Sequence, residues 1–512
     1  MPARTLGAFL ADVARLTPLQ APDLGAAEAG LVWAIAYDSR AVVPGAVFVA
    51  MRGTQRDGSA YAAQAIEKGA IAVIADSPAL ASGHVPWIVA ERGRQALAAC
   101  AATFYDHPSD KLLLVGVTGT NGKTTSTYLL EGIFRAAGWT SGRIGTTGYR
   151  VGNDERPSAR TTPEAPDLQR LLREMVDTGC RACAMEVSSH ALDLDRVAFT
   201  RFGAAIFTNL TRDHLDYHGD MEAYFVAKRR LFEMLPPEAP AAINLDDPRG
   251  ERLVETVQRP ITYALTREAD VWPTSMTLTL RGIEAEVRTP AGTMPLRMPM
   301  PGRPNAYNAL GVVAACVGLE IPLEAIADGL ATVPAVPGRF EVVSSASDDV
   351  SVIVDYAHTD DALKNLLETA RALAPQRIVT VFGCGGDRDK TKRPLMGAVA
   401  ARLSDLVILT SDNPRSEDPA AIIEDIKRGL VPPERPTRHA GHNVPAVQAT
   451  PWKAIVDREE AIVRAVVDAE PGDLVLVAGK GHESTQTIGE RVLPFDDAKV
   501  ARAALRRRGG AR

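Results

Sequence analysis

A glycine-rich segment at 116–125 reads Gly-Val-Thr-Gly-Thr-Asn-Gly-Lys-Thr-Thr and stands between an apolar run at 112–117 and a stretch with helical spacing at 124–137. A loop between a strand and a helix can bind phosphate because its backbone N–H groups and the helix N-terminus point at the anion. A strict phosphate loop has glycine where this chain has Val117, so the segment is a variant of that motif. Its context predicts nucleotide binding rather than a structural turn.

The side chains of this loop have the chemistry that a bound nucleotide requires. Gly119 and Gly122 let the backbone approach the phosphates closely. Lys123 is expected to reach the β- and γ-phosphates, and the hydroxyl of Thr124 is expected to bind Mg²⁺.

The remaining pattern predicts an α/β protein, and the length of 512 residues corresponds to about three domains. Apolar runs end at Val187, Phe207 and Leu245 with helical stretches between them, which favours a mostly parallel sheet flanked by helices. Two prolines and a glycine mark a linker at 334–339. Runs of strand length recur after it at 350–354, 377–383, 406–410 and 474–478, which predicts a second α/β unit.

Composition excludes several classes of protein. Lys plus Arg number 57 against 63 Asp plus Glu, and no basic stripe is present, so we expect no nucleic-acid partner. The longest apolar run, 309–319, is shorter than the ~18 residues of a membrane span, so we expect no membrane partner. The N-terminus lacks a secretory pattern, and the five cysteines suit reduced thiols, which together predict a cytoplasmic protein.

Two segments after predicted strands carry further candidate ligands. Glu186 stands at the carboxyl end of an apolar run, where a carboxylate can hold Mg²⁺ against phosphate oxygens. His214 lies in the polar segment 208–219, which also follows a strand, and its position favours a functional role. Asp213, Asp216 and His218 of the same segment are expected to be structural.

These motifs, taken in order, resemble those of the Mur ligases of peptidoglycan assembly. The resemblance runs nearly end to end through the segments at 38–40, 118–125, 186–190, 209–218, 355–358, 383–389 and 478–483. It implies three domains: residues 1–106 for a UDP-sugar, 107–336 with a central P-loop ATPase-like parallel sheet for ATP, and a Rossmann-like unit at 337–512 for the incoming amino acid. A monomer is the default expectation.

The resemblance also implies the residues that hold each substrate. The nucleotide-sugar is expected on Tyr37, Ser39, Thr54, Gln55 and Arg56, and its peptide end near Thr161, Thr162, Ser188 and Arg196. ATP is expected on Gly119, Thr120, Asn121, Gly122, Lys123, Thr124 and Thr125, completed by Asn305, Arg339, Asp355 and His358.

Magnesium is implied on Thr124, Glu186, His214 and Lys228. Lys228 matches a lysine that the family carbamylates with CO₂, and a carbamate would replace an ammonium that repels Mg²⁺ by an anionic oxygen ligand. Without the resemblance, Lys228 would be interpreted as a solvated helix lysine beside Arg229 and Arg230.

The segment Asp412, Asn413, Pro414 and Arg415 resembles the motif of members that add meso-diaminopimelate, since a guanidinium suits the distal carboxylate that lysine lacks. Arg393, Gly479 and Glu483 match the remaining contacts of those members, with Glu483 suited to the distal ammonium. Four positions depart from the usual pattern of the family: Arg160, Leu194, Pro304 and Asp360.

The resulting prediction is an ATP-dependent ligase that adds meso-diaminopimelate to UDP-N-acetylmuramoyl-L-Ala-D-Glu through an acyl phosphate, with Lys123, Glu186, His214 and Lys228 as catalytic groups. Alternatives are the same reaction with L-lysine, another Mur or folylpolyglutamate-type ligase, and a binding module that uses ATP to change shape.

Overall fold

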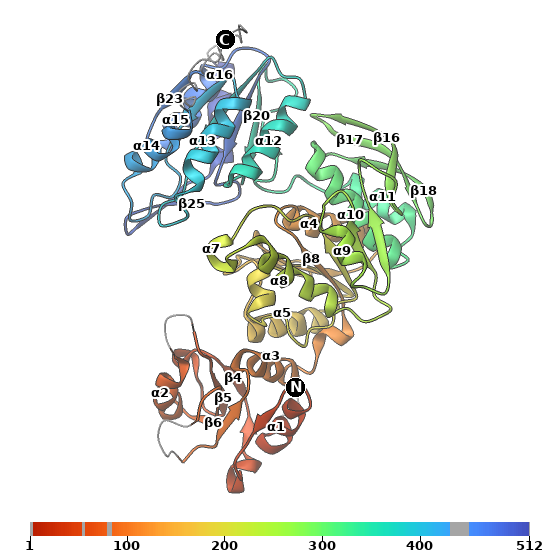
Figure 1. Ribbon diagram of the computed structural model, residues 1–512, viewed down its shortest axis with the longest axis vertical. Helices are drawn as coiled ribbons and strands as arrows, with labels where there is room; N and C mark the ends of the chain where they lie inside the picture. The colour runs from red at the N-terminus through yellow and green to blue at the C-terminus, as the bar shows by residue number, and fades with distance from the viewer. Residues whose placement is uncertain (1–3, 54–56, 79–83, 431–449, 511–512) are drawn as a thin grey trace, which may run out of the picture.

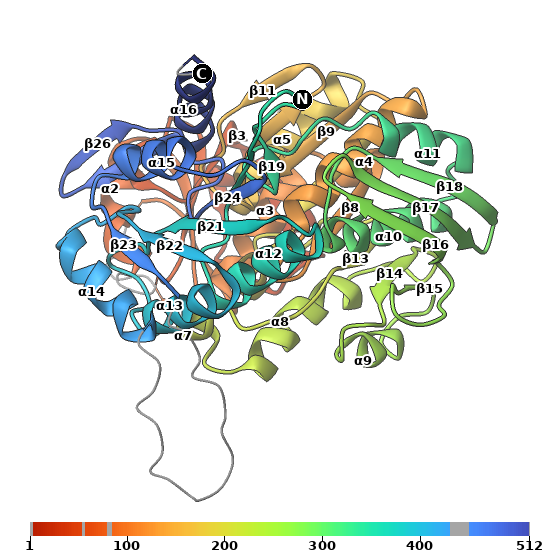
Figure 2. The ribbon, with the colours of Figure 1, turned by 90° about the horizontal axis from the view of Figure 1, so that it is seen from above.

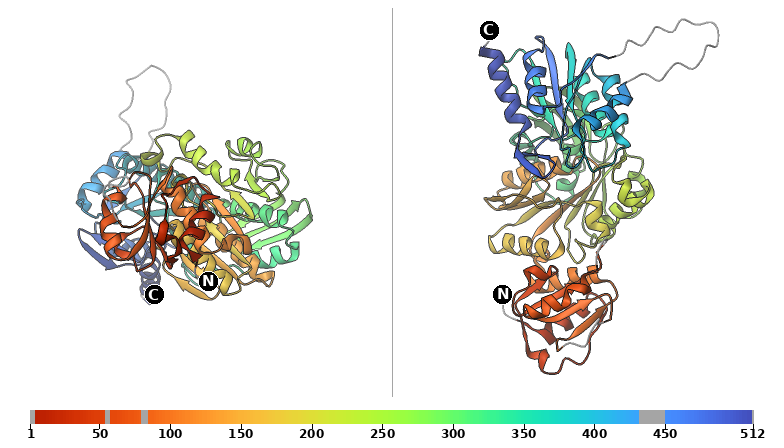
Figure 3. Two further views of the ribbon diagram at one scale, coloured as in Figure 1. Left: turned by 90° about the horizontal axis from the view of Figure 1, so that it is seen from below. Right: turned by 90° about the vertical axis from the view of Figure 1, so that its left-hand side faces the viewer.

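The computed structural model describes residues 4–53, 57–78, 84–430 and 450–510. Three parallel or mostly parallel sheets follow one another along the long axis of the molecule in chain order (Figure 1; Figure 3, right). Each sheet has helices on both faces and an apolar core on each side. The predicted α/β class is thereby confirmed.

The first sheet has the order β2 (Leu19–Gln20), β7 (Trp87–Ala90), β6 (Ala70–Ala75), β5 (Ala46–Ala50) and β4 (Ala34–Ala36). Strands β4 to β7 are parallel and β2 pairs antiparallel at the edge. Helices α1 (Leu6–Ala14), α2 (Ala62–Glu67) and α3 (Gly93–Phe104) surround it, and α3 contacts α5 (Ala165–Asp177) of the next unit. A small ladder joins β1 (Arg4–Thr5) to β3 (Leu31–Val32).

The second sheet contains the strand that leads into the glycine-rich loop. Its order is β11 (Asp154–Arg156), β10 (Gly148–Val151), β9 (Ser141–Gly145), β12 (Ala182–Glu186), β8 (Leu113–Thr118), β13 (Ala204–Phe207), β14 (Ala241–Asn244) and β15 (Pro260–Tyr263). Strands β9, β12, β8, β13, β14 and β15 are parallel, and β10 and β11 extend the sheet antiparallel.

Helices cover both faces of this second sheet. One core packs α4 (Lys123–Ala136) and α10 (Arg303–Gly318) against it, and the other packs α5 and α8 (Met221–Glu233). The longest apolar run of the sequence, 309–319, lies almost entirely in the buried part of α10. Its apolar composition is therefore explained by packing in the core. No helix of the described residues has the length and apolar character needed to cross a bilayer. Short helices α6 (Ser189–Asp193), α7 (Leu215–His218) and α9 (Gly250–Val254) lie in the connections.

An antiparallel sheet that the sequence reasoning did not anticipate is inserted before α10. It consists of β16 (Trp272–Thr279), β17 (Gly282–Thr289) and β18 (Gly292–Met298), and it projects from one side of the central unit (Figure 2). The inner face of this sheet packs near α11 (Leu323–Ala331) and carries the buried residues Ile283, Val287, Met294, Leu296 and Met298. The alternation of these residues and the glycines at 282 and 292 were available signals.

The last sheet has the order β19 (Glu341–Val342), β20 (Ser351–Asp355), β24 (Asp473–Ala478), β21 (Arg377–Phe382), β22 (Leu406–Leu409) and β23 (Trp452–Ala454), and is parallel except for β19. Helices α12 (Asp360–Ala372), α13 (Lys392–Leu403), α14 (Pro419–Leu430), α15 (Arg458–Val467) and α16 (Asp497–Gly510) flank it. A hairpin of β25 (Thr485–Ile488) and β26 (Arg491–Pro494) follows β24.

The basic C-terminal segment from Arg506 to Gly510 is the last part of helix α16. Arg508 lies in α16 with 7% exposure, forms an ion pair with Asp349 at 2.8 Å and donates to three backbone carbonyls. These partners satisfy a guanidinium that would otherwise be costly to bury. Arg508 therefore anchors the C-terminal helix to the rest of the last unit.

Candidate active site

The site begins with the order of three parallel strands. β8 lies between β12 and β13, so the segments that follow these strands emerge side by side at one edge of the sheet. Those segments are the glycine-rich loop, the stretch after Glu186, and the polar segment 208–219. Ligands bind beside the carboxyl ends of strands in open α/β sheets. The residues predicted to bind phosphate and metal therefore come together at this edge.

Gly119 shows why this loop requires glycine. Its φ is 149°, and a Cβ built there would lie 1.8 Å from Thr208 Oγ1, so the close approach of two loops leaves no room for a side chain. Lys123 folds back over the same loop, and its ammonium donates to the carbonyls of Gly119 at 2.9 Å and Thr120 at 2.8 Å. Burial lowers the pKa of Lys123.

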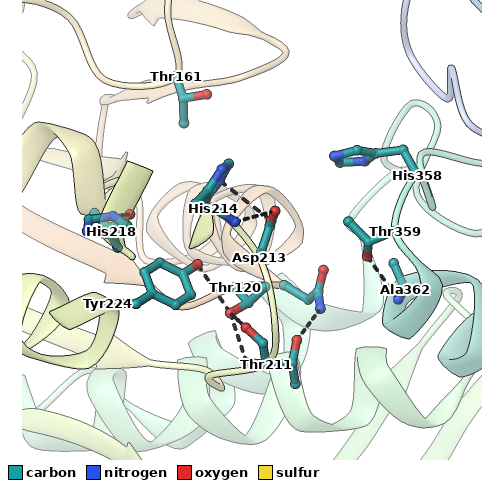
Figure 4. A network of polar contacts seen from close by, with 12 residues as sticks. Thr120, Thr161, Thr211, Asp213, His214, His218, Tyr224, His358, Thr359 and Ala362 are labelled. Carbon is teal, nitrogen blue, oxygen red and sulfur yellow. Dashed lines mark hydrogen bonds and ion pairs between the residues drawn. The ribbon is translucent and has the colours of Figure 1, made fainter. Parts of the chain in front are cut away.

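The segment after β13 holds the glycine-rich loop in place. Thr120 N donates to the Asn209 carbonyl, and Asn121 N donates to the Asn209 side chain at 3.0 Å. Thr120 Oγ1 donates to the carbonyl of Thr211 at 3.1 Å and lies 3.3 Å from the Tyr224 hydroxyl (Figure 4). Residues Gly119 to Thr125 therefore form a preorganised cradle at the N-terminus of α4.

Lys228 is buried rather than solvated. It lies in α8 with 1% exposure, its Nζ donates to the Gly119 carbonyl at 2.8 Å, and it sits 4.5 Å from the centre of the Tyr224 ring. Burial, together with the nearby charge of Lys123, lowers the pKa of Lys228 well below its usual value. The interpretation of this residue as an exposed helix lysine is therefore wrong.

Glu186 is 1% exposed, and Thr146 holds both of its carboxylate oxygens. The Thr146 amide donates to Oε1 at 2.9 Å and the Thr146 hydroxyl donates to Oε2 at 3.0 Å. The sequence reasoning missed Thr146. Its available signal was the turn-prone sequence Gly-Thr-Thr-Gly at 145–148, which connects β9 and β10.

The four residues expected near the peptide end of the substrate lie together beside Glu186. Thr162 Oγ1 donates to the Glu186 carbonyl at 2.8 Å and accepts from Ser188 N at 3.1 Å. Arg196 donates to the Thr162 carbonyl at 3.3 Å, and Thr161 Oγ1 is 3.0 Å from Thr146 Oγ1. Arg196 also pairs with Glu164 at 3.0 Å.

His214 adopts a left-handed backbone conformation, with φ of 54°, immediately before α7. Its Nε2 lies 3.5 Å from Asp213, and burial lowers the pKa of His214 to about 4, which leaves the ring neutral and able to act as a ligand at neutral pH. His218 Nε2 lies 2.9 Å from Ser189 Oγ. Figure 4 shows Asp213 and His214 beside Thr120 and Tyr224.

The donor set at this edge suits magnesium. No described group of three or more His, Cys, Asp or Glu side chains could enclose a metal ion. Mg²⁺ however prefers one or two protein oxygens together with phosphate oxygens and water. The buried carboxylate of Glu186 and the hydroxyl of Thr124, which is 4% exposed at the start of α4, supply such oxygens.

The linker brings the last unit onto the glycine-rich loop. Arg339 donates to Thr124 Oγ1 at 3.3 Å. Asp355, at the end of β20, accepts from Phe340 N at 2.7 Å and Ala357 N at 2.8 Å, and burial raises its pKa. Burial lowers the pKa of His358, whose Nδ1 lies 2.9 Å from the Tyr356 carbonyl. Figure 4 shows His358 across from Asp213 and His214.

Asn305 reaches the loop indirectly. Its amide donates to the Pro301 carbonyl at 2.8 Å and its oxygen accepts from Asn308 at 3.3 Å, while a Cβ on Gly122 would lie 2.2 Å from Asn308 Oδ1. Pro304 occupies the first turn of α10, where a missing N–H costs nothing, so this departure is accommodated.

The other three departures have local roles. Asp360 begins α12, where an acidic residue interacts favourably with the helix dipole. Arg160 pairs with Glu164 at 3.0 Å, and Leu194 caps the end of α6.

The residues expected to bind the nucleotide-sugar are only partly described. Tyr37 donates to Asp167 of α5 at 2.9 Å, which ties the first unit to the second, and Ser39 donates to Gln64 at 2.6 Å. Thr54, Gln55 and Arg56 lie outside the described residues. The structure therefore places Tyr37 and Ser39 on the first unit, and Tyr37 at its border with the central unit.

The segments expected to bind the amino acid meet at the carboxyl edge of the last sheet, after β22 and β24. Asn413 Nδ2 donates to Glu483 Oε2 at 2.7 Å, Gly479 N donates to the Asp355 carbonyl at 3.1 Å, and Arg415 donates to the Gly386 carbonyl at 2.7 Å. Asp412 and Asn413 are each 7% exposed, and Pro414 precedes Arg415, whose φ is 51°.

Arg393 differs from its neighbours because acidic side chains already occupy its guanidinium. It is 1% exposed and pairs with Glu417 at 2.8 Å and Asp425 at 3.0 Å. The hydrogen bonds from Arg393 and from the Asp387 amide lower the pKa of Glu417 to about 2.

Comparisons with known proteins agree with this architecture. Residues 32–105 match the Mur ligase family catalytic domain, residues 117–316 the Mur ligase middle domain, and residues 338–481 the Mur ligase glutamate ligase domain. The UDP-N-acetylmuramoyl-L-alanyl-D-glutamate–2,6-diaminopimelate ligase of Solibacter usitatus is 44% identical over 504 residues, 98% of either chain. Its counterpart of the same name from Geobacter sulfurreducens is 46% identical over 476 residues, covering 92% of this chain and 93% of that relative. A solved structure of a ligase with this name has a TM-score of 0.69 and 32% identity, covering 99% of this chain and all of the other.

Proposed function

The chain belongs to the Mur ligase family, and from this premise we propose that it joins meso-diaminopimelate to UDP-N-acetylmuramoyl-L-Ala-D-Glu with cleavage of ATP to ADP and phosphate. The observation that carries the proposal is that Lys123 and Lys228 converge on the Gly119 carbonyl, while Glu186 ends the neighbouring strand opposite Val117, just before the same loop. A preorganised cradle of this kind, with Lys123 beside the phosphates, is suited to transferring a phosphoryl group onto a carboxylate.

The reaction has two steps. An oxygen of the D-Glu γ-carboxylate attacks the γ-phosphorus of ATP in line, a new P–O bond forms, and the bond to the bridging oxygen breaks to release ADP. The neutral amine of diaminopimelate then attacks the acyl carbon, a C–N bond forms, phosphate leaves, and the nitrogen loses a proton. Lys123 offsets the charge that gathers on the phosphoryl oxygens.

Magnesium and a carbamylated Lys228 belong to this proposal. Thr124, Glu186, His214 and Lys228 would hold the ion, which when bound supplies positive charge next to the transferring phosphoryl group. The buried Lys228 amine faces Gly119, and its lowered pKa favours the neutral form, which is the form that reacts with CO₂. The resulting carbamate places an anionic oxygen at this position.

The assignment of substrates to units is also proposed. Residues 1–106 bind the UDP-sugar through Tyr37 and Ser39, and 107–336 bind ATP and the peptide end. Residues 337–512 bind diaminopimelate through Arg415 and Glu483. Arg393, whose guanidinium already pairs with Glu417 and Asp425, supports this site through the Gly385 carbonyl. Arg339 joins the last two units by its contact with Thr124. Closure about the linker would bring the amine to the acyl phosphate. All five cysteines are free and buried, which suits the reducing cytoplasm that we propose as its location.

An ADP-release assay with one acceptor at a time distinguishes the alternatives. We expect release only with UDP-N-acetylmuramoyl-L-Ala-D-Glu and diaminopimelate together, and none from Lys123→Ala. Equal turnover with L-lysine would indicate the lysine-adding reaction. Turnover with glutamate or D-Ala-D-Ala would indicate another ligase. ATP hydrolysis that needs no acceptor would indicate a nucleotide-switched binding module.

A further inference from the structure

Lys480 is a charged residue that the reaction described above does not use. It follows β24, its side chain has no solvent exposure, and its ammonium lies 3.0 Å from Glu483 Oε2 and 3.1 Å from Asn413 Oδ1. Burying an ammonium is costly unless it is paired and hydrogen-bonded, so its partners indicate what it is for. Both partners are among the residues proposed to bind the amino acid.

The three side chains form a closed arrangement. Besides the two contacts of Lys480, Asn413 Nδ2 donates to Glu483 Oε2 at 2.7 Å, and Thr487 N donates to Asn413 Oδ1 at 2.9 Å. Glu483 Oε2 therefore accepts two hydrogen bonds from within the protein. No described residue donates to the other carboxylate oxygen, Oε1, and the Glu483 side chain is 32% exposed.

The backbone holds Lys480 where it can make these contacts. The preceding Gly479 has φ of 119°, and a Cβ there would lie 2.6 Å from Asp412 Oδ2. The loop after β24 is thereby packed directly against the loop that carries Asn413. Lys480 reaches across this contact and links the two loops through their side chains.

We propose that Lys480 is a positioning residue for the amino-acid substrate, a role that rests on the proposed function. By holding Glu483 Oε2 inside the protein, it keeps Oε1 turned outward as the acceptor for the distal ammonium of diaminopimelate. Without Lys480, the carboxylate keeps only its bond from Asn413, and its orientation is no longer determined. Lys480 thus acts on specificity through Glu483 and does not itself touch the substrate.

The test compares diaminopimelate with 2-aminopimelate, which has both carboxylates but lacks the distal ammonium. In Lys480→Met, the KM for diaminopimelate should rise by roughly tenfold, the range expected when a hydrogen bond to a charged group is lost. The KM for ATP and the inhibition constant of 2-aminopimelate against diaminopimelate should stay unchanged. A loss of folding or of the whole pocket would change all three constants together, and that result would overturn the proposal.

A double-variant cycle measures the coupling between Lys480 and Glu483. Glu483→Gln should reduce the preference for diaminopimelate over 2-aminopimelate, and adding Lys480→Met should change it no further, because both variants remove the same interaction. Additive effects, or tighter diaminopimelate binding in Lys480→Met through removal of a repelling cation, would refute the positioning role. If the wild-type protein binds the two compounds equally, the Lys480 proposal fails alone. If it does not use diaminopimelate at all, the proposed function itself fails.

Discussion

Lys123 and Lys228, which are separated by more than a hundred residues in the sequence, donate to the same carbonyl oxygen of Gly119, at 2.9 and 2.8 Å. Two ammonium groups at one acceptor repel each other, and this repulsion adds to burial in lowering the pKa of Lys228. The arrangement is favourable once anionic phosphates are bound, or once Lys228 carries a carbamate.

Lys228→Met should reduce turnover by about 100-fold or more, because the side chain keeps its volume but loses its nitrogen and therefore any carbamate at the metal. The measurement is ADP release at saturating substrates. Arg229→Met, in the same helix and partly exposed, serves as the matched control and should retain activity. Carbon-13 bicarbonate should give a carbamate resonance in the wild type that Lys228→Met lacks. Full activity of Lys228→Met would contradict the assignment.

Thr146→Val should raise the magnesium concentration needed for half-maximal activity by roughly tenfold, as for other residues that orient metal ligands. The change removes the hydroxyl that donates to Glu186 Oε2 and leaves the backbone donor in place. Thr146→Ser retains the hydroxyl and should behave like the wild type. An unchanged magnesium dependence in Thr146→Val would show that the amide of residue 146 is sufficient to orient Glu186.

Arg415→Lys should lower kcat/KM for diaminopimelate by about 10-fold to 100-fold, because an ammonium cannot form the two parallel hydrogen bonds that a guanidinium offers to a carboxylate. Steady-state kinetics with diaminopimelate and with L-lysine measure this change. The ratio of kcat/KM for diaminopimelate to kcat/KM for L-lysine should become smaller. Arg388→Lys, an exposed change in a neighbouring loop, is the control. A uniform loss with both amino acids would point to loop disruption instead.

Acid should destabilise the fold in part through His482. Burial, together with the nearby charge of Arg339, lowers the pKa of His482 from 6.5 to about 4. As the pH falls, the unfolded chain therefore takes up this proton before the folded protein does. The contribution of neutral His482 to the free energy of unfolding is complete above pH 6.5 and is lost between pH 6.5 and pH 4.

His482→Asn should remove this contribution, so its thermal midpoint should fall less steeply than that of the wild type between about pH 6.5 and pH 4. His84→Asn, at an exposed position, should leave the slope as in the wild type. Parallel curves for wild type and His482→Asn would exclude His482 as a source of the acid sensitivity.

Much of the fold was predictable because its signals are local. The apolar run before Gly116 and the helical spacing after Lys123 predicted β8 and α4 to within a residue or two. The antiparallel sheet at 272–298 was missed because its strands are buried on one face only. Charged residues such as Glu284, Glu286 and Arg288 alternate with the buried ones, which is a weaker signal than a continuous apolar run.

The candidate site was predictable as a list of residues but not as a set of contacts. Strand-end position and the resemblance pointed to Glu186, Lys228 and Glu483. No role was predicted for Thr146 or Lys480, which hold two of them, although Lys480 lies in the segment 478–483. Arg393 was expected to face the substrate, and only the structure revealed its pairing with Glu417 and Asp425.

The order of residues along the chain was sufficient to predict the class of fold, the nucleotide loop and the family, because each depends on spacing within a short segment. Packing alone placed Lys228 on the carbonyl of Gly119 and Lys480 between Asn413 and Glu483. Such contacts join segments far apart in sequence, and the burial that shifts a pKa or restricts a carboxylate to one orientation arises only when those segments come together.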